Sequence, residues 1–221
     1  MKTNLTEIVF ILDRSGSMGG LESDTIGGFN AMLAKQQDEP GEARITTVLF
    51  DNAYEVLHDR LDINGVRPIT EKEYFVRGST ALLDAVGKTI NSIGNAQKQS
   101  KEDYQADKVI FVITTDGMEN ASREYSYERI RKMIQQQKTR YGWEFLFLGA
   151  NIDSVEFAGR FGIDKSRAQN YHNDSEGIRL NYQVVGQAVA SFRSSACGEK
   201  LPNDWNQEIQ EDYVNRGKQR K

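Results

Sequence analysis

Cysteine is nearly absent from this sequence: Cys197 is the one thiol among 221 residues, so no disulfide can form within the chain. A lone thiol favours a reducing compartment, although weakly, because disulfides accumulate mainly in exported proteins. Long apolar runs are also missing. The run at residues 8–12 is stopped by Asp13 and is too short for the core of a signal peptide, and no stretch approaches the roughly 18 apolar residues of a membrane span. We therefore expect a cytoplasmic protein with no membrane partner.

An excess of positive charge is lacking as well. The chain has 28 basic and 32 acidic residues, a formal net charge of -4, so a nucleic-acid partner is not expected. Hydrophobic residues make up 38% and charged residues 27%, which is ordinary for a globular protein. This length accommodates one large domain with a tail, or two small domains.

Short apolar runs alternate with segments of helical periodicity, a pattern typical of α/β folds with a mostly parallel sheet. Strands are expected at residues 8–12, 45–50, 53–61, 109–114, 145–148 and 168–171. Helices are expected at residues 24–37, 81–93, 127–139, 153–160 and 178–192, with a polar connector at 95–107. A tight turn at Asp51-Asn52 makes a hairpin, so one strand should be antiparallel and lie at an edge. We therefore predict a doubly wound, six-stranded, Rossmann-like domain over residues 1–195 with helices on both faces.

The tail, residues 196–221, contains Pro202 and then Trp205, Ile209 and Tyr213 with charges between them. This pattern predicts a short helix packed on the domain, ending in a frayed basic tip at residues 216–221.

Three segments should meet at the carboxyl edge of the sheet, where open α/β folds bind ligands: residues 13–17, 78–80 and 114–117. Together they offer two carboxylates and three hydroxyls, from Asp13, Ser15, Ser17, Thr80 and Asp116. Oxygen donors without His or Cys favour a hard cation, Mg²⁺ or Mn²⁺, over zinc. Hydroxyls bring no charge. If they supply most of the direct ligands, with the aspartates acting partly through water, such a cation would keep much of its positive charge and an open position for an acidic oxygen of a partner.

Several nearby residues are candidates for the rim of this site: Gly16, Ser79, Asp84, Gly117, Met118, Glu119 and Asn120. Gly16 and Gly117 would permit tight backbone geometry beside the ligands. Asp84 either hydrogen-bonds a metal-bound water or, more often for an Asp in a first helical turn, only favours the helix dipole. Lower weight goes to Asn151, Asp153, His172 and Asn173, which follow later strands at the same edge.

The segments Phe10-Ile11-Leu12-Asp13-Arg14-Ser15-Gly16-Ser17-Met18, Gly78-Ser79-Thr80 and Thr114-Thr115-Asp116-Gly117 resemble the von Willebrand factor A (vWA) family, which includes integrin inserted domains. All five positions of that family's metal-ion-dependent adhesion site (MIDAS) have a match here, in the right order. The run Asp-Arg-Ser-Gly-Ser-Met is similar to stand-alone bacterial members. The resemblance implies a vWA fold over roughly residues 5–195 and a metal that is not usually catalytic but bridges to a Glu or Asp of a protein partner.

The sequence leaves three functions open. The first is a Mg²⁺- or Mn²⁺-dependent protein–protein interaction module, without enzymatic activity or a small-molecule substrate. The second is a structural subunit of a larger assembly, in which the metal stabilises the fold or a permanent interface and the aromatic tail, with Trp205 and Tyr213, could take part. The third is a metal-dependent phosphohydrolase with Asp13 as nucleophile, but that class needs a second Asp as acid/base two residues later, where this chain has Ser15.

Overall fold

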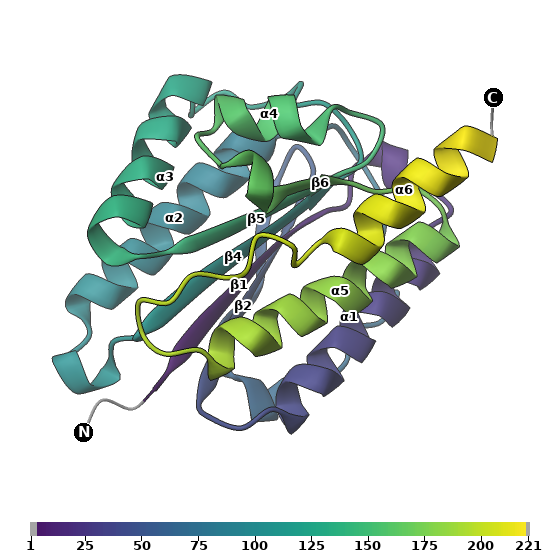
Figure 1. Cartoon of the computed structure of the whole chain (residues 1–221). Helices are drawn as coiled ribbons and strands as arrows, with labels where there is room; N and C mark the ends of the chain where they lie inside the picture. The colour runs from purple at the N-terminus through teal and green to yellow at the C-terminus, as the bar shows by residue number, and fades with distance from the viewer. Residues whose placement is uncertain (1–3, 220–221) are drawn as a thin grey trace.

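A six-stranded sheet lies between two layers of helices in the computed structural model, which describes residues 4–219 (Figure 1). The strands are β1 (Thr6–Asp13), β2 (Ala43–Phe50), β3 (Tyr54–Asp62), β4 (Lys108–Thr115), β5 (Glu144–Gly149) and β6 (Ala168–Asn170). Their order is β3-β2-β1-β4-β5-β6, with β3 antiparallel to β2 and every other neighbouring pair parallel. The predicted mostly parallel α/β sheet with one antiparallel edge strand is confirmed.

The helices divide between the two faces of the sheet. They are α1 (Glu22–Asp38), α2 (Leu82–Gln99), α3 (Tyr127–Tyr141), α4 (Ser154–Arg160), α5 (Ser175–Ser194) and α6 (Gln207–Gln219). Helices α2, α3 and α4 cover one face, whereas α1 and α5 cover the other, with α6 beside α5 (Figure 1). No helix in residues 4–219 combines the length and the apolar character needed to cross a membrane.

The central strands explain why the sheet needs two helical layers. Every residue of β1 and β4 is buried. Along β1, Phe10 and Leu12 contribute to the core under α1 and α5, while Val9 and Ile11 contribute to the core under α2 and α3. A continuous apolar strand covered on both faces is what a parallel sheet requires.

Helix α2 is longer than predicted. It continues to Gln99, so the connector expected from Asn95 onward is wrong over its first residues. Glycine inside a helix costs only about 1 kcal/mol, and Gly94 does not end this one. The last turn is held by Ser100 N, which donates to the Ala96 carbonyl oxygen at 3.0 Å.

The edge strand β3 is bulged. Its register against β2 shifts between Ile45 and Val48, and Arg60 has a positive φ of 49°. The Arg60 backbone N–H donates to Thr46 Oγ1 at 3.1 Å, and its guanidinium turns inward to the buried Glu7 carboxylate at 2.9 Å. An extra residue on one strand in this way increases twist and ends regular pairing.

The tail helix α6 packs against the rest of the chain. Ile209 is 1% exposed, and the Trp205 indole N–H donates to the Ser166 carbonyl oxygen at 2.8 Å. Tyr213 stacks on His172, with ring centroids 4.7 Å apart. Arg216, placed by the sequence in a frayed tip, pairs with Asp174 at 2.8 Å, while residues 220 and 221 lie outside the described residues. Trp205 and Tyr213, the aromatic side chains of the tail, therefore both contact other parts of this chain.

Candidate metal centre

The carboxyl ends of β1 and β4 bring the two candidate carboxylates together. The two strands are parallel neighbours, so Asp13, the last residue of β1, and Asp116, directly after β4, emerge at one edge of the sheet. The segment before α2 joins this edge because the Gly16 N–H donates to the Gly78 carbonyl oxygen at 3.1 Å. Of the five candidate ligands, Asp13, Ser15, Thr80 and Asp116 are buried and Ser17 is exposed.

The hydroxyls link the segments. Ser15 Oγ and Ser17 Oγ are 3.1 Å apart, and the Ser17 hydroxyl donates to Asp116 Oδ1. A methyl group placed on Gly117 would lie 3.5 Å from Ser17 Oγ and 3.9 Å from Thr80 Oγ1. Both hydroxyls therefore lie close to Gly117, which follows Asp116 directly.

Burial raises the pKa of both carboxyls. For Asp13, burial outweighs its hydrogen bonds with Ser15 and Thr115, and the neighbouring Asp116 raises its pKa further. For Asp116, burial outweighs the hydrogen bonds from Ser17 and Asn173. Within residues 4–219, neither carboxylate has a hydrogen bond or ion pair with Lys, Arg or His. Two close, buried acids without a cationic side chain suit a bound cation, which would favour their ionised forms.

The chemistry of the donors also fits a hard cation. In the part of the chain that the structure describes, no group of three or more His, Cys, Asp or Glu side chains is placed to hold a metal. The present cluster instead combines two carboxylates with three hydroxyls, all oxygen donors. Such a set suits Mg²⁺ or Mn²⁺ better than a metal that prefers nitrogen or sulfur ligands.

Sequence reasoning missed the groups that hold Asp13. The Thr115 hydroxyl donates to Asp13 Oδ2 at 2.6 Å, and the Ser15 backbone N–H donates to Oδ1 at 2.7 Å. The buried Tyr74 hydroxyl donates to the Asp13 carbonyl oxygen at 2.6 Å. Thr115 had a signal, since it ends β4 directly before Asp116, but nothing local to Tyr74 indicates a contact with β1.

Arg14, between two candidate ligands, points away from the carboxylates. Its side chain is fully buried, with Nε 3.1 Å from Asp51 and a terminal nitrogen 2.7 Å from Glu55. Arg77 also contacts Asp51, at 2.6 Å. Burial acts to raise the pKa of Asp51, but the hydrogen bonds from Arg77 and from the Ala53 N–H, with the charges of both arginines, lower it overall. These ion pairs fasten the loop after β1 and the segment before α2 to the β2–β3 hairpin.

The predicted rim residues have distinct positions. The Asp84 carboxylate accepts three backbone N–H groups from residues 123–125, each at 2.9 Å, so it holds that loop. Glu119 accepts the N–H of Leu83 at 2.8 Å, at the start of α2, and Asn120 Oδ1 accepts the N–H of Thr80 at 3.0 Å. Ser79 and Met118 are exposed. Neither Gly16 nor Gly117 has the positive φ that glycine adopts easily, so the conformational role expected of both is not needed.

The residues given lower weight divide into two groups. Asn173 Nδ2 donates to Asp116 Oδ2 at 3.0 Å, and Asn151 Nδ2 lies 3.4 Å from the Asp116 carbonyl oxygen. Asp153 instead caps α4 by accepting the Glu156 N–H, and His172 packs on α6. Asn173 is thus the one that reaches a candidate ligand side chain.

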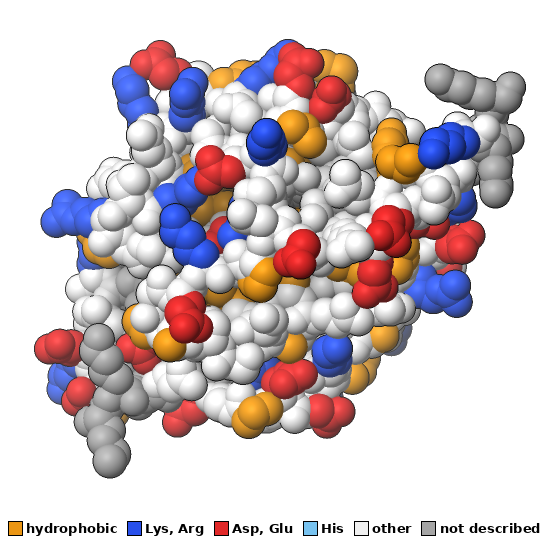
Figure 2. Space-filling view, in the orientation of Figure 1, with side chains coloured by type: hydrophobic (Ala, Val, Ile, Leu, Met, Phe, Trp, Pro, Cys, Tyr) orange, Lys and Arg blue, Asp and Glu red, His pale blue; other side chains and the backbone are white. Residues whose placement is uncertain are grey.

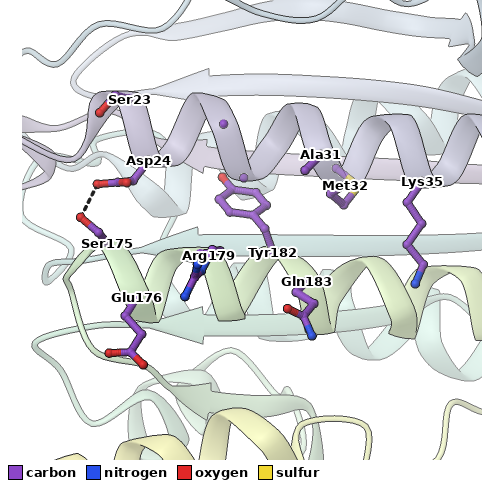
Figure 3. Close-up of a pocket in the computed structure, with 12 residues that line it drawn as sticks. Ser23, Asp24, Ala31, Met32, Lys35, Ser175, Glu176, Arg179, Tyr182 and Gln183 are labelled. Atoms are coloured by element: carbon purple, nitrogen blue, oxygen red, sulfur yellow. Dashed lines mark hydrogen bonds between the residues drawn. The ribbon is translucent and has the colours of Figure 1, made fainter.

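Two hollows lie apart from the ligand cluster. A polar one of about 760 Å³ adjoins the rim at Ser79 and Asn120. The other, of about 720 Å³, lies between α1 and α5, with Tyr182 directed toward α1 (Figure 3). On the molecular face that carries α5 and α6, acidic and basic side chains are interspersed rather than gathered by sign (Figure 2).

The fold of this chain is similar to that of known proteins, although its sequence is not. No protein-family model matches the sequence, and no curated protein is similar to it in sequence. Solved structures do match: the PilB minor pilin from Streptococcus sanguinis (14% identity, TM-score 0.58, covering 86% of this chain and 63% of that one) and a von Willebrand factor type A protein from Catenulispora acidiphila (14%, 0.57, 84% and 42%). The chain has the von Willebrand factor A fold.

A further vWA neighbour carries a metal. Proximal thread matrix protein 1 from the mussel byssus, solved with a zinc-occupied MIDAS motif, is 14% identical with a TM-score of 0.53, over 84% of this chain and 46% of that one. The chain spans less than two thirds of the length of each of these three neighbours. At such identities the likeness shows the vWA fold alone.

Proposed function

We propose that this vWA chain is a Mg²⁺- or Mn²⁺-dependent protein–protein interaction module. Asp13, Ser15, Ser17, Thr80 and Asp116 would hold the metal, and the metal would bind an exposed Glu or Asp side chain of a partner. The observation that carries the proposal is the link from Ser15 through Ser17 to Asp116, which joins oxygens of the β1 and β4 loops in one cluster. The zinc-occupied MIDAS of the mussel protein supports a divalent cation at this place in the fold.

The residues around the cluster favour binding over catalysis. Ser15 stands where a phosphohydrolase would need its acid/base carboxylate, and its backbone N–H is committed to Asp13. With three neutral hydroxyls as direct ligands and the two aspartates acting partly through water, a divalent cation would keep net attraction for another anion. Glu119 and Asp84, the nearest other acids in sequence to Asp116 and Thr80, accept backbone N–H groups. We propose a cytoplasmic location because the single cysteine suits a reducing compartment.

The test measures metal binding and partner binding in the same variants. Isothermal titration of the chelator-treated chain with Mn²⁺ should show one site, which Asp13→Ala removes and Asp38→Ala, a change at an exposed carboxylate at the end of α1, leaves intact. Affinity capture from a lysate with Mg²⁺ or with EDTA should then recover partners that depend on both the metal and Asp13. A partner set that is indifferent to EDTA and to Asp13→Ala would contradict the proposal.

A further inference from the structure

One side chain outside the five candidate ligands fixes the carboxylate of Asp116. Asn173 lies between β6 and α5, and its Nδ2 donates to Asp116 Oδ2 at 3.0 Å. The Ser17 hydroxyl donates to the other oxygen, Oδ1. With one donor on each oxygen, the plane of the carboxylate is held from two sides.

The amide oxygen of Asn173 is also buried. Asn173 Oδ1 is buried and accepts no hydrogen bond from the described residues. Asn173 therefore brings an oxygen acceptor as well as a donor to the edge of the metal centre. A water bound to the cation is the kind of group that such an oxygen accepts.

The position of Asn173 depends on helix α6 because both of its sequence neighbours contact that helix. His172 stacks on Tyr213 at 4.7 Å between centroids, with an interplanar angle of 25°. Asp174 receives two hydrogen bonds from the Arg216 guanidinium, at 3.0 and 2.8 Å. The segment 172–174 is thus held on the side that faces the C-terminal helix.

The start of α5 holds this segment from the other direction. Asp174 caps α5 by accepting the Gly177 N–H at 2.9 Å. A methyl group on Gly177 would lie 2.0 Å from the His172 carbonyl oxygen, so the segment rests directly on the first turn of the helix. Ser175 donates to Asp24 of α1 at 2.7 Å, a contact drawn in Figure 3. These contacts leave Asn173 little freedom to turn away from Asp116.

We propose that Asn173 is a positioning residue of the metal centre and that α6, through Tyr213 and Arg216, keeps it in place. The inference rests on the proposed function, since it concerns the affinity of the same site for its metal. Helix α6 lies outside the six-stranded sheet and, within residues 4–219, forms no hydrogen bond with the five candidate ligands, yet it contributes to metal binding through segment 172–174.

The experiment compares Mn²⁺ affinities in the full chain. Asn173→Ala removes the donor to Asp116, and its matched control, Asn91→Ala, removes an amide that donates to Tyr125 on the α2 side of the molecule at 2.9 Å. Arg216→Ala breaks the contact with Asp174, and Arg160→Ala breaks an exposed ion pair of α4. Isothermal titration gives the affinity, the electron paramagnetic resonance spectrum of bound Mn²⁺ reports its ligand symmetry, and thermal unfolding in EDTA reports stability without metal.

We expect Asn173→Ala to weaken Mn²⁺ binding by about 10- to 100-fold, as loss of an outer partner of a metal ligand does, and to change the spectrum of the bound ion. Arg216→Ala should weaken binding in the same direction by about threefold or more, while both controls bind as the unmodified chain does. Unmodified affinity in Asn173→Ala, even with lowered stability in EDTA, would overturn the inference and leave the proposed function intact. Unmodified affinity in Arg216→Ala alone would overturn the role of α6. Failure of the unmodified chain to bind Mn²⁺ would instead overturn the proposed function.

Discussion

The buried ion pair between Arg14 and Asp51 makes a sharp prediction about stability. Both side chains are fully buried, and removing one partner of a buried pair commonly costs 3–5 kcal/mol because the other charge is left uncompensated. Glu55 lies 2.7 Å from Arg14 and still compensates part of its charge, although Glu55 is 48% exposed. The stability lost in Asp51→Asn should therefore be near the lower end of this range, about 3 kcal/mol. For a chain of this size that corresponds to a fall in melting temperature of about 6–12 °C.

Urea unfolding in EDTA measures this loss without a contribution from metal binding. The matched control is Glu55→Gln, whose exposed carboxylate should contribute less than about 1 kcal/mol. Combined with Arg14→Met, Asp51→Asn should cost less than the sum of the two single changes, since no buried charge then remains unpaired. An Asp51→Asn variant within about 1 kcal/mol of the unmodified chain would refute the reasoning.

The same pair has a defined pH dependence. The pKa of Asp51 in the folded chain lies below the ordinary value of 3.8. Its ionised form is therefore favoured by folding, and its contribution is fully present above that ordinary value. The contribution is lost as the pH falls through the lowered pKa, so the stability gap between the unmodified chain and Asp51→Asn should be constant at neutral pH and shrink only in strong acid.

Further changes should be as informative. In Gly27→Ala, the added methyl group on α1 meets no atom within 4 Å, so the change should stabilise the chain by about 0.5–1 kcal/mol in urea unfolding. In Gly28→Ala, the methyl group would lie 2.4 Å from Tyr182, so the change should cost about 1–3 kcal/mol. Equal effects of the two changes would contradict the packing of α1 on α5. Asp84→Ala should cost about 3 kcal/mol, with or without Mn²⁺, because three N–H groups lose their acceptor; a loss seen only with Mn²⁺ would place Asp84 on the metal instead. Mn²⁺ at 100 times its dissociation constant should stabilise the chain by about 2.7 kcal/mol in differential scanning fluorimetry, and Asp116→Ala should abolish that gain.

Strand periodicity predicted the sheet well because it is a local property. The buried run of β1 and the hairpin turn at Asp51-Asn52 were enough to place an antiparallel strand at the edge. The ends of helices were harder. Gly94 marked a false end for α2, and α5 begins at Ser175 rather than at the first apolar residue, because Asp174 provides its cap.

The metal centre was predictable only as far as it follows strand ends. Asp13 and Asp116 end or directly follow strands, so their proximity could be expected from a parallel sheet. Tyr74 reaches Asp13 across 61 residues of sequence and Asn173 reaches Asp116 across 57. Such contacts depend on how loops and helices pack in space, which no local pattern encodes. The fixed roles of Asp84 and Glu119 likewise appear only when the loop after Asp116 is seen folded over the start of α2.

The two edges of the sheet have a consequence for self-association. An open strand edge is a template for strands of other molecules, and so a route to aggregation. At one edge, the positive φ of Arg60 and the shifted register of β3 interrupt the row of free backbone groups. At the other, β6 has only 3 residues, and α6 lies beside it with Asn206 bonded to Gln169 at 2.8 Å. At both edges, the stretch of regular strand that a second copy of the chain could extend is therefore short.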